Sequence, residues 1–234
     1  MKDNNINKCL TFLKDIKLFS SMNEDELLKI IEKINIKPFK KGQTVIEQDD
    51  ANNYMYIVLD GSVKVTQLTE EGKEIVLASR QAGEYFGELS LIDGKTTSAT
   101  VSATSDCVVA IISKETFNFL LSSSTKITDN LLQTLCLRLR GTIETIQMLN
   151  HHNACKRLRL FFDQLSKECG KETDKGVIIQ AKLTQQEIAD STGLARQTVT
   201  ELMSEWKKKE DIVILKGKSI LLTRKFIQDS YCKG

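Results

Sequence analysis

Between residues 38 and 113 the hydrophobic residues stop following helical spacing and gather in short runs rich in Val, Ile, Tyr and Thr. Turn-forming dipeptides that end in glycine separate these runs at the spacing of a jelly roll or a small barrel. The runs are TVIEQ, YMYIVL, SVKVTQL, EIVLAS, TSATVSA and CVVAII, and the dipeptides are Lys41-Gly42, Asp60-Gly61, Glu71-Gly72, Ala82-Gly83 and Asp93-Gly94. Because helical patterns flank this segment, we predict an α+β chain built on an N-terminal antiparallel β-barrel or jelly roll.

The chain has 234 residues, more than a single domain usually has, so two modest cores are expected. With 41% hydrophobic and 27% charged residues, it has the composition of a globular protein. The net charge of +2 is too small to indicate a nucleic-acid binder by itself. No apolar run is long enough to span a bilayer, and residues 1–7 lack the core of a signal peptide. We therefore expect a cytoplasmic protein without a membrane partner.

Two helices are predicted on either side of the β domain. Residues 18–34 have an apolar face at helical spacing, and Asn23 and Glu26 have the spacing of a capping box. In the second helix the apolar residues alternate between spacings of three and four, which is the pattern of a coiled-coil seam. Such a face can also pack on its own barrel, and both alternatives stay open, although we favour dimerisation. The seam residues are Leu132, Leu135, Leu139, Thr142, Ile146 and Leu149.

The last part of the chain has the spacing of a helix-turn-helix. Thr184 and Glu187 form a capping box that starts one helix, Gly193 permits a tight turn, and a second helix follows over residues 196–208. Two short β-runs, residues 212–215 and 219–223, enclose the basic sequence Lys216-Gly217-Lys218 and predict a wing. A helix over residues 158–167 and a polar loop over residues 170–176 precede this motif.

In this order, the predicted elements resemble the Crp/Fnr family of bacterial transcription regulators over nearly the whole chain. The most specific matches are Gly87-Glu88-Leu89-Ser90, with the core of the family's phosphate-binding cassette, and Gln186-Glu187-Ile188-Ala189 and Thr198-Val199, with its helix-turn-helix. The resemblance implies a cyclic-nucleotide-binding-like barrel, a dimerisation helix and a winged helix-turn-helix. It predicts an effector-sensing domain with an N-terminal helix at residues 1–120, a dimerisation helix and hinge at 121–150, and a DNA-binding domain at 151–234.

A recognition helix offers its N-terminal residues to base edges in the major groove. The candidate base-reading residues are Arg196, Gln197, Thr200 and Glu201. Arg196 matches a base-contacting arginine of the family, whereas Gln197 and Glu201 replace a common glutamate and arginine, and Glu201 has the alternative of facing solvent. Ala195 stands where the family often has a serine N-cap. Candidate phosphate contacts, which give affinity without reading sequence, are Thr184, Gln185, Thr198, Lys216 and Lys218.

The resemblance also implies an effector pocket made of Gly87, Glu88, Leu89, Ser90, Thr97, Ser98 and Thr142. In nucleotide-binding members an arginine after the cassette neutralises the phosphate, but Thr97 occupies that position here. The serine expected after Thr142 is Ile143. A buried phosphate without a paired cation is costly, so the effector is left unidentified, with cyclic AMP or cyclic GMP as the alternative. A purely structural role for Gly87 and Glu88 is favoured modestly.

The cysteines and histidines leave the cofactor undetermined. Six scattered cysteines without a CxxC pair are interpreted mainly as buried small hydrophobes, with a thiol sensor as the alternative. No iron-sulfur cluster is expected, since only Cys9 lies near the N-terminus. Haem stays open, although a hinge is the commoner context for His151 and His152. A small apolar or aromatic effector, a redox signal and nitric oxide also stay open.

These observations predict a homodimeric transcription regulator that binds double-stranded promoter DNA, contacts RNA polymerase and responds to an unidentified small molecule. A metal-dependent enzyme on the same scaffold needs barrel histidines, and residues 38–113 contain none, so no enzymatic activity is expected. A non-enzymatic dimeric interaction module is the remaining alternative. We hypothesise that effector contact near Glu88, Thr97 and Thr142 shifts the seam, and that a hinge at residues 150–153 reorients the recognition helices.

Overall fold

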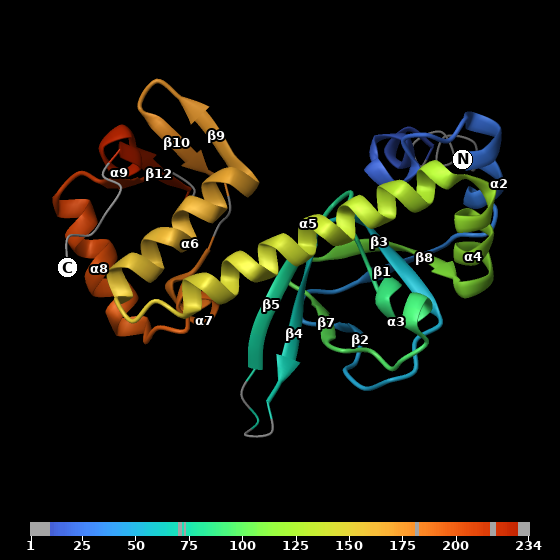
Figure 1. The fold of residues 1–234 in the computed structure, drawn as a ribbon, viewed down its shortest axis with the longest axis horizontal. Coiled ribbons are helices and arrows are strands. Elements are labelled where there is room, and N and C mark those ends of the chain that lie inside the picture. The colour runs from blue at the N-terminus through green and yellow to red at the C-terminus, as the bar shows by residue number, and fades with distance from the viewer. Residues whose placement is uncertain (1–9, 70–71, 73, 181–182, 216–218, 229–234) are drawn as a thin grey trace. The chain divides into compact units, whose positions relative to one another are not determined.

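The structure is a computed structural model, which describes residues 10–69, 72, 74–180, 183–215 and 219–228 (Figure 1). The chain divides into two compact units, Met1–Leu137 and Arg138–Gly234, and each is described by itself. Over the described ranges, no helix combines the length and the apolar character needed to cross a membrane.

In the described part of the first unit the strands form two four-stranded antiparallel sheets, which agrees with the predicted antiparallel β domain (Figure 1). One sheet has the order β1-β8-β3-β6 and the other has the order β2-β7-β4-β5. Strands β1 and β6 are additions to the six predicted runs. The strands are β1 (Asn35–Phe39), β2 (Thr44–Ile46), β3 (Tyr54–Asp60), β4 (Ser62–Leu68), β5 (Glu74–Gln81), β6 (Tyr85–Phe86), β7 (Thr100–Ala103) and β8 (Cys107–Ser113).

Strand β3 is buried on both faces, which explains its continuous apolar run. Tyr56 and Val58 belong to the core between the sheets, where the Tyr56 ring stacks on Phe86 with centroids 5.1 Å apart. Met55 and Ile57 belong to a second core, which the helices of this unit cover. The β domain is therefore stabilised from both sides of its first sheet.

The helices of the first unit begin at polar caps. Asn23 Oδ1 accepts a 2.9 Å hydrogen bond from the Glu26 amide, and Glu26 Oε2 accepts one of 2.9 Å from the Asn23 amide. This capping box is confirmed, but the helix it starts is shorter than residues 18–34. Residues 17–19 form a separate 3-10 turn that follows a helical stretch at residues 10–15, and α2 ends at Ile31. The elements are η1 (Lys17–Phe19), α2 (Glu24–Ile31), α3 (Glu88–Asp93), α4 (Lys114–Ser123) and α5 (Thr125–Leu149), of which the last continues into the second unit.

The second unit combines helices with a four-stranded sheet of order β11-β12-β10-β9. The predicted polar loop at residues 170–176 is wrong, because β9 pairs with β10 there; β9 lies at the edge of the sheet with mostly exposed side chains, so it carries no apolar alternation. The wing strands are confirmed, whereas Lys216-Gly217-Lys218 lies outside the described residues. The elements are α6 (Ala154–Cys169), β9 (Gly170–Thr173), β10 (Gly176–Ile179), α7 (Gln185–Thr192), α8 (Arg196–Lys208), β11 (Ile212–Ile214), β12 (Ile220–Thr223) and α9 (Arg224–Gln228).

Three aromatic rings form the centre of this second core. Trp206 packs edge-on against Phe226 and Phe162, with ring centroids 5.1 and 6.1 Å apart. Such edge-to-face pairs add to the free energy gained from burial. Because these rings come from α8, α9 and α6, they fix the position of α8 within its unit.

Candidate nucleic-acid interface and effector pocket

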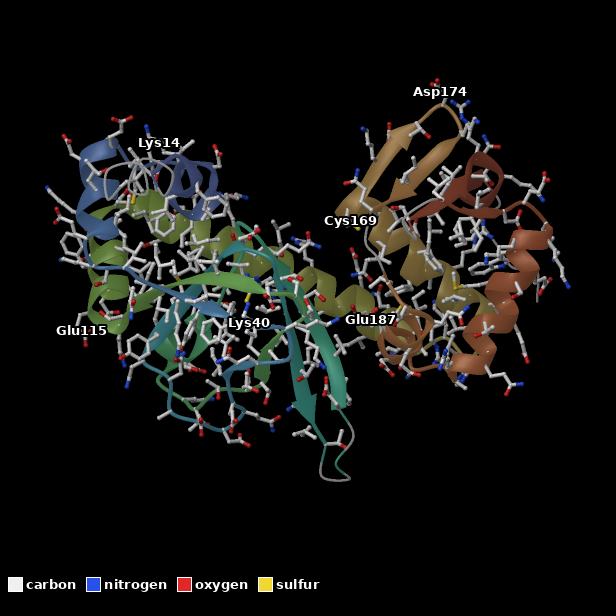
Figure 2. The ribbon with its side chains drawn as sticks, turned by 180° about the vertical axis from the view of Figure 1, so that it is seen from behind. Lys14, Lys40, Glu115, Cys169, Asp174 and Glu187 are labelled. Carbon is white, nitrogen blue, oxygen red and sulfur yellow. The ribbon has the colours of Figure 1, made fainter. Side chains whose placement is uncertain are left out.

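The first helix of the predicted helix-turn-helix begins and ends as its sequence indicates. Thr184 Oγ1 accepts a 3.2 Å hydrogen bond from the Glu187 amide, and Glu187 Oε2 accepts one of 2.7 Å from the Thr184 amide. Figure 2 labels Glu187 on this helix. Gly193 ends α7 at a φ of 60°, a conformation that favours glycine. The capping box and the tight turn are confirmed.

Helix α8 has a buried face and a face toward solvent. Val199, Met203 and Trp206 lie in the core of the second unit. Arg196 and Gln197, on the first turn, are exposed. The helix therefore offers its N-terminal side chains outward, as a recognition helix must. Of the other two predicted base-reading residues, Glu201 is exposed and Thr200 is half-buried.

A hydrogen bond joins two of the predicted base-reading residues. Gln197 Nε2 donates a 2.9 Å hydrogen bond to Glu201 Oε1, one helical turn further on. Glu201 thus does more than face solvent, because it orients the Gln197 amide. Thr200 Oγ1 lies 2.8 Å from both Gln185 Oε1 and the Arg196 carbonyl oxygen, which places it between α7 and α8.

The predicted phosphate contacts are only partly described. Thr184 is exposed, whereas Gln185 and Thr198 are half-buried. Lys216 and Lys218 lie outside the described residues. Helix α8 begins at Ala195 without a side-chain cap, as predicted.

The lysines at the end of α8 differ in their surroundings. Lys207 and Lys208 are exposed. Lys209 forms an ion pair with Glu205, and hydrogen bonding to that carboxylate raises the pKa of Lys209. Lys207 and Lys208 thus differ from Lys209 in lying outside this ion pair.

An arginine that sequence reasoning missed joins the predicted hinge to the helix-turn-helix. Arg157 donates to the His151 carbonyl oxygen from Nε (3.1 Å) and Nη2 (2.7 Å). Its Nη1 donates to the carbonyl oxygens of Thr192 (3.2 Å) and Gly193 (3.3 Å). The residues after α5 are therefore fastened to the turn before α8. No motif spacing points to this role, because the partners are carbonyl groups that every residue carries.

The seam helix α5 exposes most of its predicted apolar face. Leu132, Leu139, Ile146 and Leu149 are exposed, and Leu139 keeps 61% of its surface accessible. Thr142 is exposed as well.

One predicted seam residue, Leu135, differs from the others in its surroundings. Leu135 packs against the helical core of its own unit, as the alternative to dimerisation predicts for the whole face. Ile143 and Cys136, which the predicted seam omits, are exposed instead. The exposed row is therefore Leu132, Cys136, Leu139, Ile143 and Ile146, again with alternating spacings of four and three.

Close packing and hydrogen bonds within the β domain hold the backbone of the cassette. Gly87 has a φ of 82°, and a Cβ there would lie 2.8 Å from the Tyr54 carbonyl oxygen, so only glycine fits. Asn52 Nδ2 donates to the carbonyl oxygens of Gly87 (3.1 Å) and Tyr54 (2.7 Å). Within α3, Glu88 and Ser90 are buried and Leu89 is exposed. The structural interpretation of Gly87 is thus supported.

Thr97, where the resemblance predicts an arginine in nucleotide-binding members, is buried in the loop that follows the cassette. Its hydroxyl donates to the Glu47 carbonyl oxygen, and its amide donates a 2.9 Å hydrogen bond to the Asp50 carbonyl oxygen. The side chain therefore joins two segments of its own domain. Ser98 is exposed. Thr142 belongs to the second unit, where its hydroxyl donates a 3.0 Å hydrogen bond to the Arg138 carbonyl oxygen.

The cysteines are less uniform than the sequence interpretation proposes. Cys107 is buried, and burial raises the pKa of its thiol, as expected for an unreactive cysteine. Cys155 and Cys169 are half-buried and pack against the core of the second unit, and Cys155 is disulfide-bonded. Cys136 is exposed, so the assignment to buried hydrophobes is wrong for that residue. Cys9 and Cys232 lie outside the described residues.

Both halves of the chain match known domain families. Residues 36–124 match the cyclic nucleotide-binding domain, and residues 156–225 match the Crp-like helix-turn-helix domain. The cAMP-activated global transcriptional regulator CRP of Salmonella typhimurium is 30% identical over 80% of this chain and 89% of its own length. The global nitrogen regulator of Synechococcus elongatus is 29% identical over 83% of this chain and 91% of its own.

Solved structures show the same fold. A CooA mutant from Carboxydothermus hydrogenoformans superposes with a TM-score of 0.77 at 22% identity, over 92% of this chain and 95% of that chain. FixK2 of Bradyrhizobium japonicum superposes with a TM-score of 0.72 at 17% identity, over 86% and 98%. Together with the domain matches and the similarity in sequence, these likenesses make the chain a member of the Crp/Fnr family of DNA-binding transcription regulators.

Proposed function

We propose that this chain is a homodimeric regulator that reads an operator sequence through α8 and is controlled by an effector bound in its β domain. The observation that carries the proposal is the division of α8 into an anchored and an exposed face. Val199, Met203 and Trp206 hold the helix, while Arg196 and Gln197 face solvent at its N-terminus. An interaction module without DNA binding has no need of this arrangement.

The exposed residues have complementary partners among the base edges. Arg196 can grip the two acceptors of a guanine, and Glu201 can accept from the amino group of a cytosine. Gln197 has two amide hydrogens, so it can donate one to Glu201 and still bind an adenine through the other hydrogen and its oxygen. We propose that Gln197 and Glu201 read the operator as one unit.

A second copy of this chain is the proposed partner of α5. The exposed row Leu132, Cys136, Leu139, Ile143 and Ile146 has the spacing of a two-stranded coiled coil. Apolar side chains in one continuous stripe favour burial against an identical stripe. Two-fold pairing presents two recognition helices to half-sites one helical turn apart.

Arg157 gives the proposed hinge a physical link to the reading helix. Its guanidinium joins the His151 carbonyl, just after α5, to the Gly193 carbonyl, just before α8. A change at the end of α5 is thereby passed to the helix-turn-helix through hydrogen bonds to a charged group. We propose contact with RNA polymerase, a cytoplasmic location and no catalytic activity, as expected of a transcription regulator.

Selection from a random-sequence DNA pool, followed by gel-shift titration in increasing salt, tests DNA reading. Wild-type protein is expected to enrich one palindromic sequence and to lose affinity steeply with salt. Arg196→Ala is expected to weaken binding about tenfold or more and to relax selection at one position per half-site. The matched control is Arg224→Ala, an exposed arginine on α9. Failure of the wild-type protein to enrich any sequence contradicts the proposal.

Oxidative cross-linking through Cys136 tests the seam. Because Cys136 lies in the exposed row, two copies bring their thiols together across the two-fold axis, and mild oxidation is expected to yield a covalent dimer. Cys136→Ser is expected to abolish this product and Cys169→Ser to leave it unchanged. Leu139→Asp places a charge in the seam and is expected to yield monomers by light scattering. A wild-type monomer at micromolar concentration contradicts the proposed dimer.

Cyclic AMP is the alternative effector, since relatives with similar sequences are named as cAMP-activated. The hydroxyl of Thr97 already bonds within its own domain and carries no positive charge. Calorimetric titration of the full chain with cyclic AMP and cyclic GMP distinguishes the two cases. We expect no saturable binding of either nucleotide at micromolar concentration, and tight binding that also raises operator affinity would establish the alternative.

A further inference from the structure

One predicted base-reading residue, Thr200, lies away from the exposed face of α8. Arg196 and Thr200 are one helical turn apart, so they belong to the same row along the helix. Arg196 is exposed, whereas Thr200 is half-buried. The Thr200 hydroxyl lies against α7, where its oxygen is 2.8 Å from Gln185 Oε1. Thr200 therefore has its side-chain partner in the neighbouring helix.

This contact leaves one end of the Gln185 amide without a partner. Gln185 is the first residue of α7 and is half-buried. Its Oε1 is 2.8 Å from the Thr200 hydroxyl, and its Nε2 forms no hydrogen bond to any residue that the structure describes. An amide NH2 group carries two donors and no acceptor. The free end of Gln185 can therefore bind only a hydrogen-bond acceptor.

The Thr200 hydroxyl has one hydrogen and two acceptors within reach. The second acceptor is the Arg196 carbonyl oxygen, also 2.8 Å away. When the hydrogen points to Arg196, the hydroxyl can accept from the Gln185 amide; when it points to Gln185, the amide is held with its NH2 group outward. An acceptor outside the protein favours the second arrangement, because only the NH2 group can donate to it.

The place of Gln185 in the fold indicates which part of a DNA duplex supplies this acceptor. In a helix-turn-helix the second helix lies in the major groove, while the first helix crosses the sugar-phosphate backbone. Gln185 belongs to the first helix, and phosphate oxygens accept hydrogen bonds from neutral side chains. A hydrogen bond to a charged phosphate is stronger than one between neutral groups.

We infer that Thr200 is a positioning residue, whose hydroxyl holds the Gln185 amide so that Nε2 donates to a phosphate of the bound duplex. The inference rests on the proposed function and adds a residue role to the same interface. Because Gln185 is neutral, the contact adds affinity without displacing the counterion that a lysine or an arginine displaces. Thr200 thus contributes equally on every DNA sequence and reads no base.

Gel-shift titration on two fixed duplexes tests the inference, with the sequence that wild-type protein enriches most and a scrambled version of it. Thr200→Val removes the hydroxyl and keeps the shape of the side chain, Thr200→Ser keeps the hydroxyl, and Gln185→Leu removes the amide. The double variant Thr200→Val/Gln185→Leu completes a mutant cycle. Ser204→Ala is the matched control, because the Ser204 hydroxyl donates a 2.7 Å hydrogen bond to the backbone of its own helix, at the Thr200 carbonyl oxygen.

Thr200→Val and Gln185→Leu are each expected to weaken binding to both duplexes about fivefold to tenfold. The double variant is expected to bind no more weakly than either single variant, because both changes remove the same contact. Thr200→Ser and Ser204→Ala are expected to bind like wild-type protein. The dependence of affinity on salt is expected to stay unchanged in Thr200→Val, since no charge is removed.

Replacement of one DNA phosphate at a time by a neutral methylphosphonate checks the contact in wild-type protein, without relying on a variant that folds. Among the positions that weaken wild-type binding, one per half-site is expected to have no effect on Thr200→Val or Gln185→Leu. A residue that only packs α7 on α8 lowers the unfolding midpoint without singling out one phosphate.

Additive losses in the double variant, or a phosphate scan in which Thr200→Val responds like wild-type protein at every position, would overturn the inference. A changed operator preference in Thr200→Val would also overturn it, because Thr200 would then read a base. Either result with intact operator selection rejects this inference alone. Coupled losses on both duplexes, in a wild-type protein that enriches no sequence, reject the proposed operator reading and leave the phosphate contact standing.

Discussion

The helix-turn-helix and the cassette both have the backbone structure expected of the family, but they differ in which of their side chains face solvent. At α8 the core residues Val199 and Trp206 are buried, and Arg196 is exposed. At the cassette the positive φ of Gly87 requires glycine, and the Thr97 hydroxyl bonds to the backbone of its own domain. A shared backbone structure therefore keeps the position of a site without keeping the side chains that give the site its chemistry.

The difference follows from how each region holds its functional residues. In α8 the helical period separates anchoring residues from displayed ones, so a displayed residue changes without loss of packing. The loop after the cassette contacts residues that are distant in the sequence, and Thr97 forms its hydrogen bonds to the carbonyl oxygens of Glu47 and Asp50 there.

Trp206→Ala removes the ring that anchors α8 and has the largest expected effect. Loss of its contacts with Phe162 and Phe226 leaves a cavity, and the expected cost is about 3–5 kcal/mol of unfolding free energy in the second unit. Urea unfolding followed by circular dichroism measures the cost, and hydrogen exchange assigns it to a unit. Equal loss of protection in the β domain would show that the two regions are not separately stabilised.

The elements that sequence predicts well are those with local signals. The capping boxes at Asn23 and Thr184 and the turn at Gly193 depend on residues within one turn of each other. Local sequence patterns do not identify the partners of strand β9 or of the Thr97 hydroxyl. Thr97 and its partner Glu47 are 50 residues apart in the sequence. The backbone of both regions could therefore be predicted, whereas the hydrogen bond from the Thr97 hydroxyl to Glu47 required the three-dimensional structure.

Thr97→Val tests the claim that Thr97 has a structural role in the loop after the cassette. The substitution keeps the side chain's shape but removes a buried donor from the Glu47 carbonyl oxygen, at an expected cost of about 1–3 kcal/mol. Chemical unfolding monitored by hydrogen exchange in the first unit measures it. Ser98→Ala, at the exposed neighbouring position, is the control and is expected to change stability by less than about 0.5 kcal/mol. Equal effects would mean that Thr97 is free to serve a ligand.

Glu201→Ala tests whether the displayed residues of α8 act as a pair. Without the 2.9 Å hydrogen bond to Glu201, the Gln197 amide loses its fixed orientation. Discrimination at the affected operator positions is expected to fall about tenfold, within the range for one good base contact. Binding selection on a random DNA pool measures the change position by position. An unaltered selected sequence would show that Gln197 reads without help.

Ala195→Ser has the smallest expected effect and is expected to stabilise the second unit. Helix α8 begins at Ala195 without a side-chain hydrogen bond, so a serine hydroxyl there is expected to accept from a first-turn amide and add about 1 kcal/mol. Thermal unfolding followed by the fluorescence of Trp206, the chain's single tryptophan, reports on this unit. Ala82→Ser, in the exposed turn after β5, is the control and is expected to leave the midpoint unchanged. A gain in stability with unchanged operator affinity would show that the N-cap of α8 affects stability without affecting the residues that read DNA. Reduced affinity would show that the start of the helix itself contacts the DNA.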